Sequence, residues 1–350
     1  MIKIGVIGCG HWGPNHIRVF NQLSHSQVTM CADLDEGRLK TMKTLYPSLR
    51  TTKNYKEIFK DKEVDAVCIA SPTNTHFSIA KEALEADKHV FCEKPLTLKP
   101  EECLQLKEFA ERQKKILMVG HVFIFHQAIL KLKEYIRSGE IGRIHYAYSE
   151  RTHLGPFRYD VNALWDLAPH DISIFNFLLE SVPLNVSGRG AKCLGTSLED
   201  LSFASLEYPG NILVNVHVSW LAPKKVRQIT IIGDKKMVVW DDLDNLGPIH
   251  LYDKHVEKTS KYYETYGEFQ LLSREGSVTI PKIDFHEPLK LQAQYFLDCV
   301  EKNKSPDLSD ALRAHEVVTV LQAIQRSMDN LGAPEMISLP SAVSGGRSVR

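Results

Sequence analysis

A glycine-rich turn near the start of the chain has the residue types and spacing that hold a dinucleotide. Gly8, Gly10 and Gly13 form a G-x-G-x-x-G pattern between the apolar run Ile2–Ile7 and a helical stretch, Asn15–Leu23. In that setting the first glycine permits a tight turn, the second lets the backbone approach a pyrophosphate, and the third allows close packing of helix and strand. Amide groups at the start of the helix supply donors for the phosphates. The contacts expected from this turn are Gly8, Gly10, His11, Trp12 and Gly13.

A carboxylate placed after the turn indicates which dinucleotide is bound. Asp33 follows a second apolar run, Val28–Ala32, and lies twenty residues beyond Gly13. An acid at this place accepts a hydrogen bond from the adenosine ribose and repels a 2′-phosphate. Arg38 is near enough in sequence to keep NADP open as an alternative. We therefore expect NAD as the cofactor, with both Asp33 and Arg38 at its adenosine end.

Short apolar runs alternate with helical patterns over the first third of the chain. The runs are Ile2–Ile7, Val28–Ala32, Val64–Ala70, His89–Cys92 and Ile116–Val119. Helical faces between them carry Ile79, Ala80, Ala83 and Leu84, and then Leu106, Phe109 and Ala110. Apolar strands that alternate with helices predict a parallel sheet covered on both faces. We expect a doubly wound α/β domain over residues 1–122.

The pattern changes after Ile144. The expected elements are a helix near Asn162–Leu179, strands at Val214–Trp220, Val226–Ile232 and Lys236–Trp240, and two closing helices at Leu289–Val300 and Asp310–Met328. Consecutive strands joined by a tight turn at Gly233-Asp234 favour a largely antiparallel open sheet. The sequence predicts a second α/β domain over residues 123–340 and a tail without periodicity over residues 341–350.

Composition argues against several classes of partner. Basic and acidic residues number 43 each, so no net charge favours nucleic acid. No apolar run approaches the roughly 20 residues that span a bilayer, and the first residues lack the features of a signal peptide. The seven cysteines are scattered, as expected for reduced thiols in a cytoplasmic protein. His121 and His126 lack helical spacing and no further ligand is patterned near Asp166, His170 and Asp171, so we expect no metal site.

Two motifs are more specific together than the glycine turn. Glu93-Lys94-Pro95 follows a strand-like run, and Asp166-Leu167-Ala168-Pro169-His170 comes about seventy residues later. With these and the run Ser71-Pro72-Thr73-Asn74-Thr75-His76, nearly the whole chain resembles the glucose–fructose oxidoreductase / inositol dehydrogenase family of two-domain dehydrogenases. The resemblance implies a Rossmann domain and a second α/β domain whose open sheet often mediates oligomerisation, here as a homodimer or homotetramer. It also implies an active site in the cleft between the domains.

The resemblance implies roles for particular residues. The family's lysine maps onto Lys94, and its aspartate–histidine pair maps onto Asp166 and His170, which we expect to be the catalytic residues. Glu93 and the loop Ser71–His76, after the third run, would contact the nicotinamide end of the cofactor. The Lys94–Pro95 bond is a candidate cis peptide that would aim the lysine into the cleft. The loop contacts expected are Ser71, Pro72, Asn74 and His76.

These residue types suit the oxidation of an alcohol. A base must take the hydroxyl proton as the hydride leaves, and a histidine with a pKa of about 6.5 does so at neutral pH. Asp166 and His170 are four residues apart, so on a helix they share a face, where one can bind the substrate while the other acts as base. Lys94 can stabilise alkoxide charge and hold the hydroxyl over the nicotinamide.

The run before the aspartate departs from the family's usual glycine-rich stretch. Here it reads Asp160-Val161-Asn162-Ala163-Leu164-Trp165. With the opening Gly-His-Trp-Gly-Pro-Asn, it resembles a branch that works on nucleotide sugars in surface-polysaccharide pathways. That branch is similar to UDP-N-acetylglucosaminuronate 3-dehydrogenases, which oxidise the sugar C3 hydroxyl before an aminotransferase acts. An anionic sugar needs cationic groups, and the candidates are Arg151, Arg158, Lys224, Lys225 and Arg227. The substrate contacts expected are His121, Arg158, Tyr159, Asn162 and Trp165.

Two other functions stay open. The same chemistry on a free polyol, inositol or aldose would not need Arg158. A non-catalytic NAD-binding regulator would not need a base, and the presence of Lys94, Asp166 and His170 argues against it.

Overall fold

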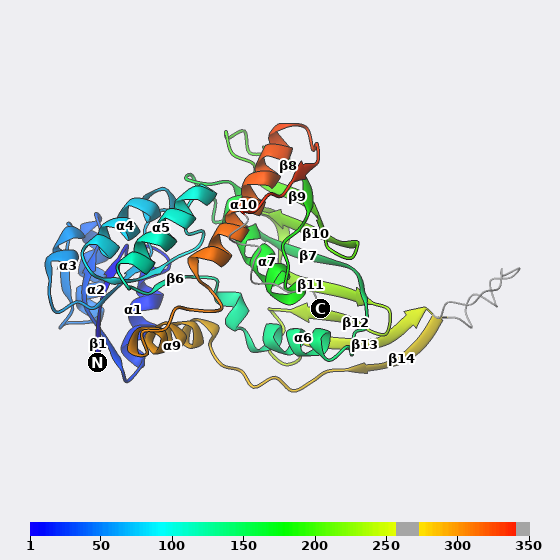
Figure 1. The fold of residues 1–350 in the computed structure, drawn as a ribbon, viewed down its shortest axis with the longest axis horizontal. Coiled ribbons are helices and arrows are strands. Elements are labelled where there is room, and N and C mark those ends of the chain that lie inside the picture. Colours follow the sequence, from blue (N-terminus) through cyan, green and yellow to red (C-terminus); the bar gives the residue numbers. More distant parts are fainter. Residues whose placement is uncertain (257–272, 341–350) are drawn as a thin grey trace, which may run out of the picture. The chain divides into compact units, whose positions relative to one another are not determined.

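The structure is a computed structural model that describes residues 1–256 and 273–340 (Figure 1). Its contacts divide the chain into two compact units. The first contains residues 1–125 and 286–322, and the second contains the described residues of 126–285 together with 323–338. The tail expected over residues 341–350 lies outside the described residues.

The first unit is built on a six-stranded sheet in the order β3-β2-β1-β4-β5-β6. The strands are β1 (Ile2–Ile7), β2 (Ser26–Ala32), β3 (Arg50–Thr52), β4 (Ala66–Ile69), β5 (His89–Cys92) and β6 (Leu117–Val119). Every neighbouring pair is parallel. The order reverses between β1 and β4, which is where a doubly wound sheet binds ligands at its carboxyl edge.

Helices cover both faces of this sheet, as the sequence predicts. They are α1 (Gly13–Gln22), α2 (Glu36–Leu45), α3 (Lys56–Lys60), α4 (His76–Glu85), α5 (Pro100–Arg112), α9 (Pro288–Glu301) and the first part of α10 (Ala311–Asp329), with the 3₁₀ turns η1 (Thr73–Thr75) and η2 (Val122–Phe125). In Figure 1, α4 and α5 lie on one side of the sheet and α1 and α9 on the other. The predicted apolar face of α4 is buried.

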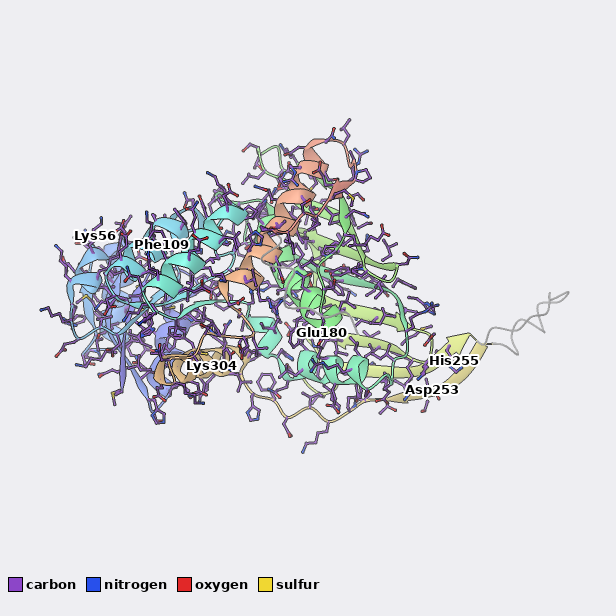
Figure 2. The ribbon with its side chains drawn as sticks, viewed as in Figure 1. Lys56, Phe109, Glu180, Asp253, His255 and Lys304 are labelled. Carbon is purple, nitrogen blue, oxygen red and sulfur yellow. The ribbon has the colours of Figure 1, made fainter. Side chains whose placement is uncertain are left out.

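Phe109 on α5 differs from the expectation that it packs in the core. Leu106 and Ala110 are buried, but Phe109 is half-buried. Phe109 is labelled in Figure 2. The Lys81 Nζ and the Arg112 Cζ lie over its ring at 5.0 and 4.5 Å from the centroid. The ring therefore makes cation–π contacts at the surface of the helix pair.

Helix α9 packs with the first unit, although the sequence places residues 123–340 in one continuous second domain. Phe296 on α9 lies 6.3 Å from Phe20 on α1 and 5.7 Å from Phe91 on β5, ring centroid to centroid. All three rings are buried. A helix distant in sequence therefore completes this core, which local periodicity does not indicate.

The second unit is built on a nine-stranded sheet in the order β14-β13-β12-β11-β7-β10-β9-β8-β15. The strands are β7 (Ile144–Leu154), β8 (Asn185–Ala191), β9 (Leu201–Tyr208), β10 (Ile212–Ser219), β11 (Leu221–Gly233), β12 (Met237–Asp241), β13 (Ile249–Val256), β14 (Ser273–Thr279) and β15 (Glu335–Met336). Only β7 and β10 run parallel; the other described pairs are antiparallel.

Two helices of the second unit, α6 (Gln127–Arg137) and α7 (Ala163–Leu179), pack against each other, and α7 contacts β7, β9 and β10. Most of α7 is buried on all sides. The apolar face of β10, at Val214, Val216 and Val218, is buried. The side chain of Asn215 is exposed on the other face.

The predicted fold class is confirmed: a Rossmann-type parallel sheet and a second α/β unit with a mostly antiparallel sheet. Within residues 1–256 and 273–340, no helix combines the length and apolar character needed to cross a membrane.

Candidate active site

The glycine turn after β1 is closed by contacts that leave no room for side chains. Gly8 has φ +93°, and a Cβ there would lie 2.6 Å from the carbonyl oxygen of Ala70 at the end of β4. A Cβ on Gly13, the first residue of α1, would overlap the carbonyl oxygen of Gly8. The turn therefore needs glycine at Gly8 because of its positive φ, and at Gly13 because of the close packing.

The other residues of the turn lie on its open side. His11 is exposed, Trp12 is half-buried, and their rings meet edge to face at 5.4 Å. A Cβ on Gly10 would meet only the Arg38 guanidinium, at 3.6 Å. Among the described residues, no side chain caps the first amides of α1. The turn thus fits a dinucleotide, since its backbone donors remain open to a pyrophosphate.

Asp33 is fixed at the carboxyl end of β2. Its side chain, 8% exposed, accepts hydrogen bonds from Cys9 N at 2.7 Å and from Asp35 N at 2.8 Å. An Arg38 nitrogen lies 3.6 Å from the carboxylate, and the Arg38 side chain is 54% exposed. The carboxylate is therefore held beside the turn, where it can accept a ribose hydroxyl.

His76 ties the loop after β4 to the segment after β5. Its Nδ1 lies 2.9 Å from the carbonyl oxygen of Pro95, and its Nε2 lies 2.9 Å from that of Ser71. The ring is 1% exposed. Pro72 and Asn74 in the same loop are exposed. His76 therefore holds the two segments together, whereas Pro72 and Asn74 are accessible to a ligand.

Glu93 and Lys94 are both 7% exposed and share a small network. His16 Nε2 donates to Glu93 Oε1 at 2.7 Å, and the backbone N–H of Lys94 donates to Glu93 Oε2 at 3.1 Å. Burial would raise the pKa of Glu93, but the His16 hydrogen bond and the nearby positive charges outweigh it and lower that pKa. The Lys94–Pro95 bond is cis, as expected.

His121 follows β6 and is electrostatically coupled to both members of this pair. Its ring is 2% exposed, and burial lowers its pKa to about 4, with Glu93 raising it and Lys94 lowering it further. The Ser309 hydroxyl donates to Val119 O at 2.7 Å and lies 3.3 Å from His121 Nδ1. Since the hydroxyl proton goes to the carbonyl, Nδ1 carries a proton and the neutral ring keeps Nε2 as an acceptor.

In the second unit, Asp166 lies in the first turn of α7 and both its oxygens are bound. Arg158 Nη1 donates to Oδ1 at 3.1 Å, and Trp220 Nε1 donates to Oδ2 at 3.2 Å. The Asp166 side chain is 17% exposed. Arg158 also donates to both oxygens of Asp160. The sequence predicts a substrate contact for Arg158; the structure shows a residue that already binds two carboxylates.

His170 lies one turn after Asp166 on the same helix and is 8% exposed. Its neighbour Asp171 forms a bidentate ion pair with Arg151 on β7, at 2.8 and 3.1 Å, with both side chains at least 97% buried. The helix turn that carries His170 is therefore fastened to the sheet. Arg151, one of the candidate cations for the substrate, therefore has its guanidinium buried on this aspartate.

The remaining candidate contacts separate into buried and exposed groups. Asn162 caps α7 through Trp165 N at 3.1 Å, and its amide donates to Glu199 and Gln325. Trp165 is buried, while Tyr159 is 91% exposed. The structure thus gives Asn162 a capping role and leaves the substrate contacts of Tyr159 and Trp165 as predictions.

The other cationic candidates are Arg227, which is half-buried, and Lys224 and Lys225, which are exposed. Arg227 pairs with Asp242 at 3.0 Å. Lys224 and Lys225 are exposed on β11, where residues 222–225 bulge between the pairs Leu221↔Leu154 and Val226↔Thr152. Across the described part of the chain, no group of three side chains is arranged to hold a metal ion.

Three residues of these networks were missed by the sequence analysis. His16, Trp220 and Ser309 contact Glu93, Asp166 and His121 respectively. A histidine on the buried face of a helix whose other buried residues are apolar is a pattern that would have indicated His16.

Family comparisons agree with this architecture. Residues 2–121 match the model of an oxidoreductase family with an NAD-binding Rossmann fold, and residues 129–239 match the GFO/IDH/MocA C-terminal domain. UDP-N-acetylglucosamine 3-dehydrogenase of Acidithiobacillus ferrooxidans is 28% identical over 256 residues, 72% of this chain and 77% of that protein. Inositol 2-dehydrogenase 2 of Saccharopolyspora erythraea is 32% identical over 224 residues, 62% of this chain and 66% of that protein. This chain covers 60% of the length of a third curated relative, which is less than two thirds of that protein.

Solved structures show the same fold over almost the whole chain. The A. ferrooxidans enzyme, GnnA, has a TM-score of 0.78 at 24% identity, covering 94% of this chain and 98% of that chain. GenD2 from gentamicin A biosynthesis, solved in complex with NAD, has a TM-score of 0.81 at 21% identity and covers 97% of each chain. The chain therefore belongs to the GFO/IDH/MocA family of oxidoreductases, whose cofactor is NAD.

Proposed function

We propose that the chain is a dehydrogenase that oxidises a secondary hydroxyl, at C3, of a nucleotide-activated sugar such as UDP-N-acetylglucosaminuronate. The basic bulge at Lys224–Lys225 carries the proposal. It begins two residues after Trp220, which binds Asp166, and neither lysine has an ion pair with another described residue. Two exposed ammonium groups, four and five residues after the tryptophan that binds this acid, suit the diphosphate of a nucleotide sugar. The similarity to a UDP-N-acetylglucosamine 3-dehydrogenase supports the same substrate class.

The proposed roles follow from the chemistry of each side chain. The glycine turn and Asp33 would hold NAD, which would supply the hydride acceptor. His170 takes the hydroxyl proton, because a neutral imidazole is a suitable base near pH 7. Asp166, oriented by Arg158 and Trp220, accepts a hydrogen bond from a sugar hydroxyl. Lys94 stabilises the alkoxide charge that develops as the proton leaves.

The test is a substrate panel followed by NADH absorbance. Purified protein and NAD are mixed with UDP-N-acetylglucosaminuronate, UDP-N-acetylglucosamine, UDP-glucuronate, myo-inositol, glucose and xylose. Turnover of a UDP sugar that is lost in Lys94→Ala and His170→Asn is the expected result. Lys224→Ala/Lys225→Ala should raise KM for that sugar, whereas Lys290→Ala, an exposed lysine on α9, should not. Silence on the whole panel with NAD binding intact would contradict the proposal and favour a regulatory protein.

A free polyol or inositol is the second candidate substrate. Inositol 2-dehydrogenase 2 is 32% identical over its matched part. Arg158, one of the cations expected to bind an anionic substrate, forms ion pairs with Asp160 and Asp166 instead. Turnover of myo-inositol alone, unaffected by the Lys224→Ala/Lys225→Ala change, would select this alternative.

We also propose a place for the reaction in surface-polysaccharide biosynthesis in the cytoplasm. The opening Gly-His-Trp-Gly-Pro-Asn and the run before Asp166 support the branch. A C3 ketone is the substrate that an aminotransferase requires, so a transaminase that accepts the oxidised sugar would follow.

We further propose a homo-oligomer that associates through the open face of the second sheet. Tyr146, Tyr148, Phe203 and Leu213 are 42 to 53% exposed there, around a shallow hollow of about 370 Å³. Such an apolar patch on a strand surface is typical of an interface. Light scattering after chromatography should give a dimer or tetramer for the parent and a smaller species for Tyr148→Glu/Leu213→Glu.

A further inference from the structure

His16 is a buried polar residue with one hydrogen-bonded ring nitrogen. It lies on α1, is 0% exposed, and packs against aromatic rings, with centroids 5.2 Å from Phe91 and 6.3 Å from Phe20. Its Nε2 donates to Glu93 Oε1 at 2.7 Å, while Nδ1 has no hydrogen-bond partner among the described residues. Burying an imidazole in such surroundings costs free energy that a phenylalanine would not. The compensating contact is the one to Glu93.

Glu93 lies where four segments of the first unit meet: α1, β4, β5 and the segment after β6. Around its carboxylate lie His16 from α1, Cys68 from β4, Cys92 from β5, Lys94, and His121 after β6. Burial raises the pKa of both thiols well above the ordinary value, and burial lowers that of His121, so these three are uncharged near neutral pH. Lys94 is a charged neighbour of this carboxylate, and it lowers the pKa of Glu93.

The second oxygen of Glu93, Oε2, binds the backbone of Lys94. Lys94 N–H donates to this oxygen at 3.1 Å. A Cβ at Gly120 would lie 3.0 Å from the same oxygen, so the segment after β6 leaves the carboxylate little space to turn. With Oε1 held by His16, both ends of the carboxylate are fixed.

We propose that His16 is a positioning residue, which acts by holding the Glu93 carboxylate in the orientation that fixes the backbone and the charge environment of Lys94. This inference rests on the proposed dehydrogenase function, in which Lys94 acts on the substrate hydroxyl. His16 touches no reacting atom in this account. Its Nε2–H donor stabilises the ionised form of the buried carboxylate, which lowers the pKa of Glu93.

A titration without cofactor or substrate tests the first step. The variants are His16→Phe, which removes the donor, and His16→Gln, whose amide nitrogen replaces Nε2. Phe20→Leu is the matched control, since it loosens the same aromatic cluster and leaves the hydrogen bond. Carboxyl carbons of glutamate are followed by NMR, with the Glu93 resonance assigned from Glu93→Gln. We expect the midpoint of Glu93 to rise by about one pH unit or more in His16→Phe and to stay near the parent's in the other two variants.

An unchanged Glu93 midpoint in folded His16→Phe would overturn the proposal. Should His16→Phe fail to fold, the comparison of His16→Gln with His16→Asn decides, because the shorter amide of asparagine does not reach the carboxylate. An equal midpoint in those two variants would then count against the proposal.

A double-mutant cycle tests the link to turnover. His16→Phe should lower kcat by about tenfold to a hundredfold, leave KM for the sugar almost unchanged, and move the acidic limb of the kcat profile to higher pH. In a Glu93→Gln background the same change should have little further effect, because His16 acts through the carboxylate. Additive losses would refute this step.

The two proposals fail in different ways. If the parent turns over inositol and no nucleotide sugar, the cycle is run on inositol, and the role of His16 stands or falls independently of the substrate. If no substrate is turned over, the titration alone decides whether His16 holds Glu93.

Discussion

The indole of Trp220 donates its Nε1 hydrogen bond to Oδ2 of Asp166 at 3.2 Å, so a residue after β10 fixes a carboxylate in the first turn of α7. Trp220 is 1% exposed, and Arg158 occupies the other oxygen of Asp166. The two donors, Trp220 and Arg158, together fix the orientation of the Asp166 carboxylate. In the proposed reaction that orientation decides where a sugar hydroxyl is held.

Trp220→Phe should therefore impair catalysis as well as stability. Losing a hydrogen bond to a charged group costs about 1.5 to 3 kcal/mol, and a loosened Asp166 should lower kcat/KM by about tenfold. Steady-state kinetics and thermal unfolding give the two quantities. Trp240→Phe makes the same change at a buried tryptophan on β12 and controls for lost volume. Equal kinetic losses in the two variants would mean that packing, and not the hydrogen bond, explains the effect.

The buried pair Arg151–Asp171 should be a major determinant of stability in the second unit. Arg151→Met leaves an aspartate at 1% exposure without its partner, which costs about 3 to 5 kcal/mol. Chemical unfolding measures the difference. Arg137→Met, which breaks the half-exposed pair with Glu180 (labelled in Figure 2), should cost about 1 kcal/mol or less. Arg151→Met/Asp171→Leu should recover part of the loss, and a double variant no more stable than the single one would argue against the electrostatic explanation.

Local patterns were enough to predict five of the six strands of the first sheet and the glycine turn. The strand β1 was predicted at Ile2–Ile7 and β5 at His89–Cys92, because each is a short run bounded by polar or glycine residues. The edge strand β3 was missed, since Arg50–Thr52 is exposed or half-exposed and carries no apolar pattern. The strand β7 was missed for a related reason: Tyr146 and Tyr148 put aromatic rings on its open face and disrupt a simple alternation of apolar and polar residues.

The partners of the site residues could not be predicted in the same way. Arg151 resembles a free cation in the sequence until the fold brings Asp171, twenty residues away, against it. His16 and Glu93 are 77 residues apart, and Trp220 and Asp166 are 54 apart. Such contacts depend on which strands pair and which helix face turns inward, and spacing along the chain carries neither.

Asp33→Ser should shift cofactor preference toward NADP. The carboxylate at the end of β2 repels a 2′-phosphate, and Arg38, with a nitrogen 3.6 Å away, would then be free to bind one. The ratio of kcat/KM for NAD to that for NADP should fall by about a hundredfold. Asp35→Asn is the control, since Asp35 caps α2 through Gly37 N and Arg38 N and should affect stability alone. An unchanged ratio in Asp33→Ser would show that the ribose is recognised elsewhere.

Glu316 on α10 should make the stability of the first unit depend on pH. Its side chain is 4% exposed, and burial raises its pKa to about 7, although Arg313 lies 3.3 Å away. An acid whose pKa is raised on folding stabilises the fold below its unfolded pKa, and that contribution is lost as pH rises from about 4.5 to 7. Glu316→Gln removes this loss. The free energy of unfolding of the variant minus that of the parent should therefore be about 2 to 3 kcal/mol greater at pH 8 than at pH 4. Thermal unfolding of both proteins at the two pH values measures the change. Glu301→Gln, an exposed glutamate on α9, should show no such dependence. A pH-independent difference between Glu316→Gln and the parent would mean that Arg313 keeps the carboxylate ionised throughout.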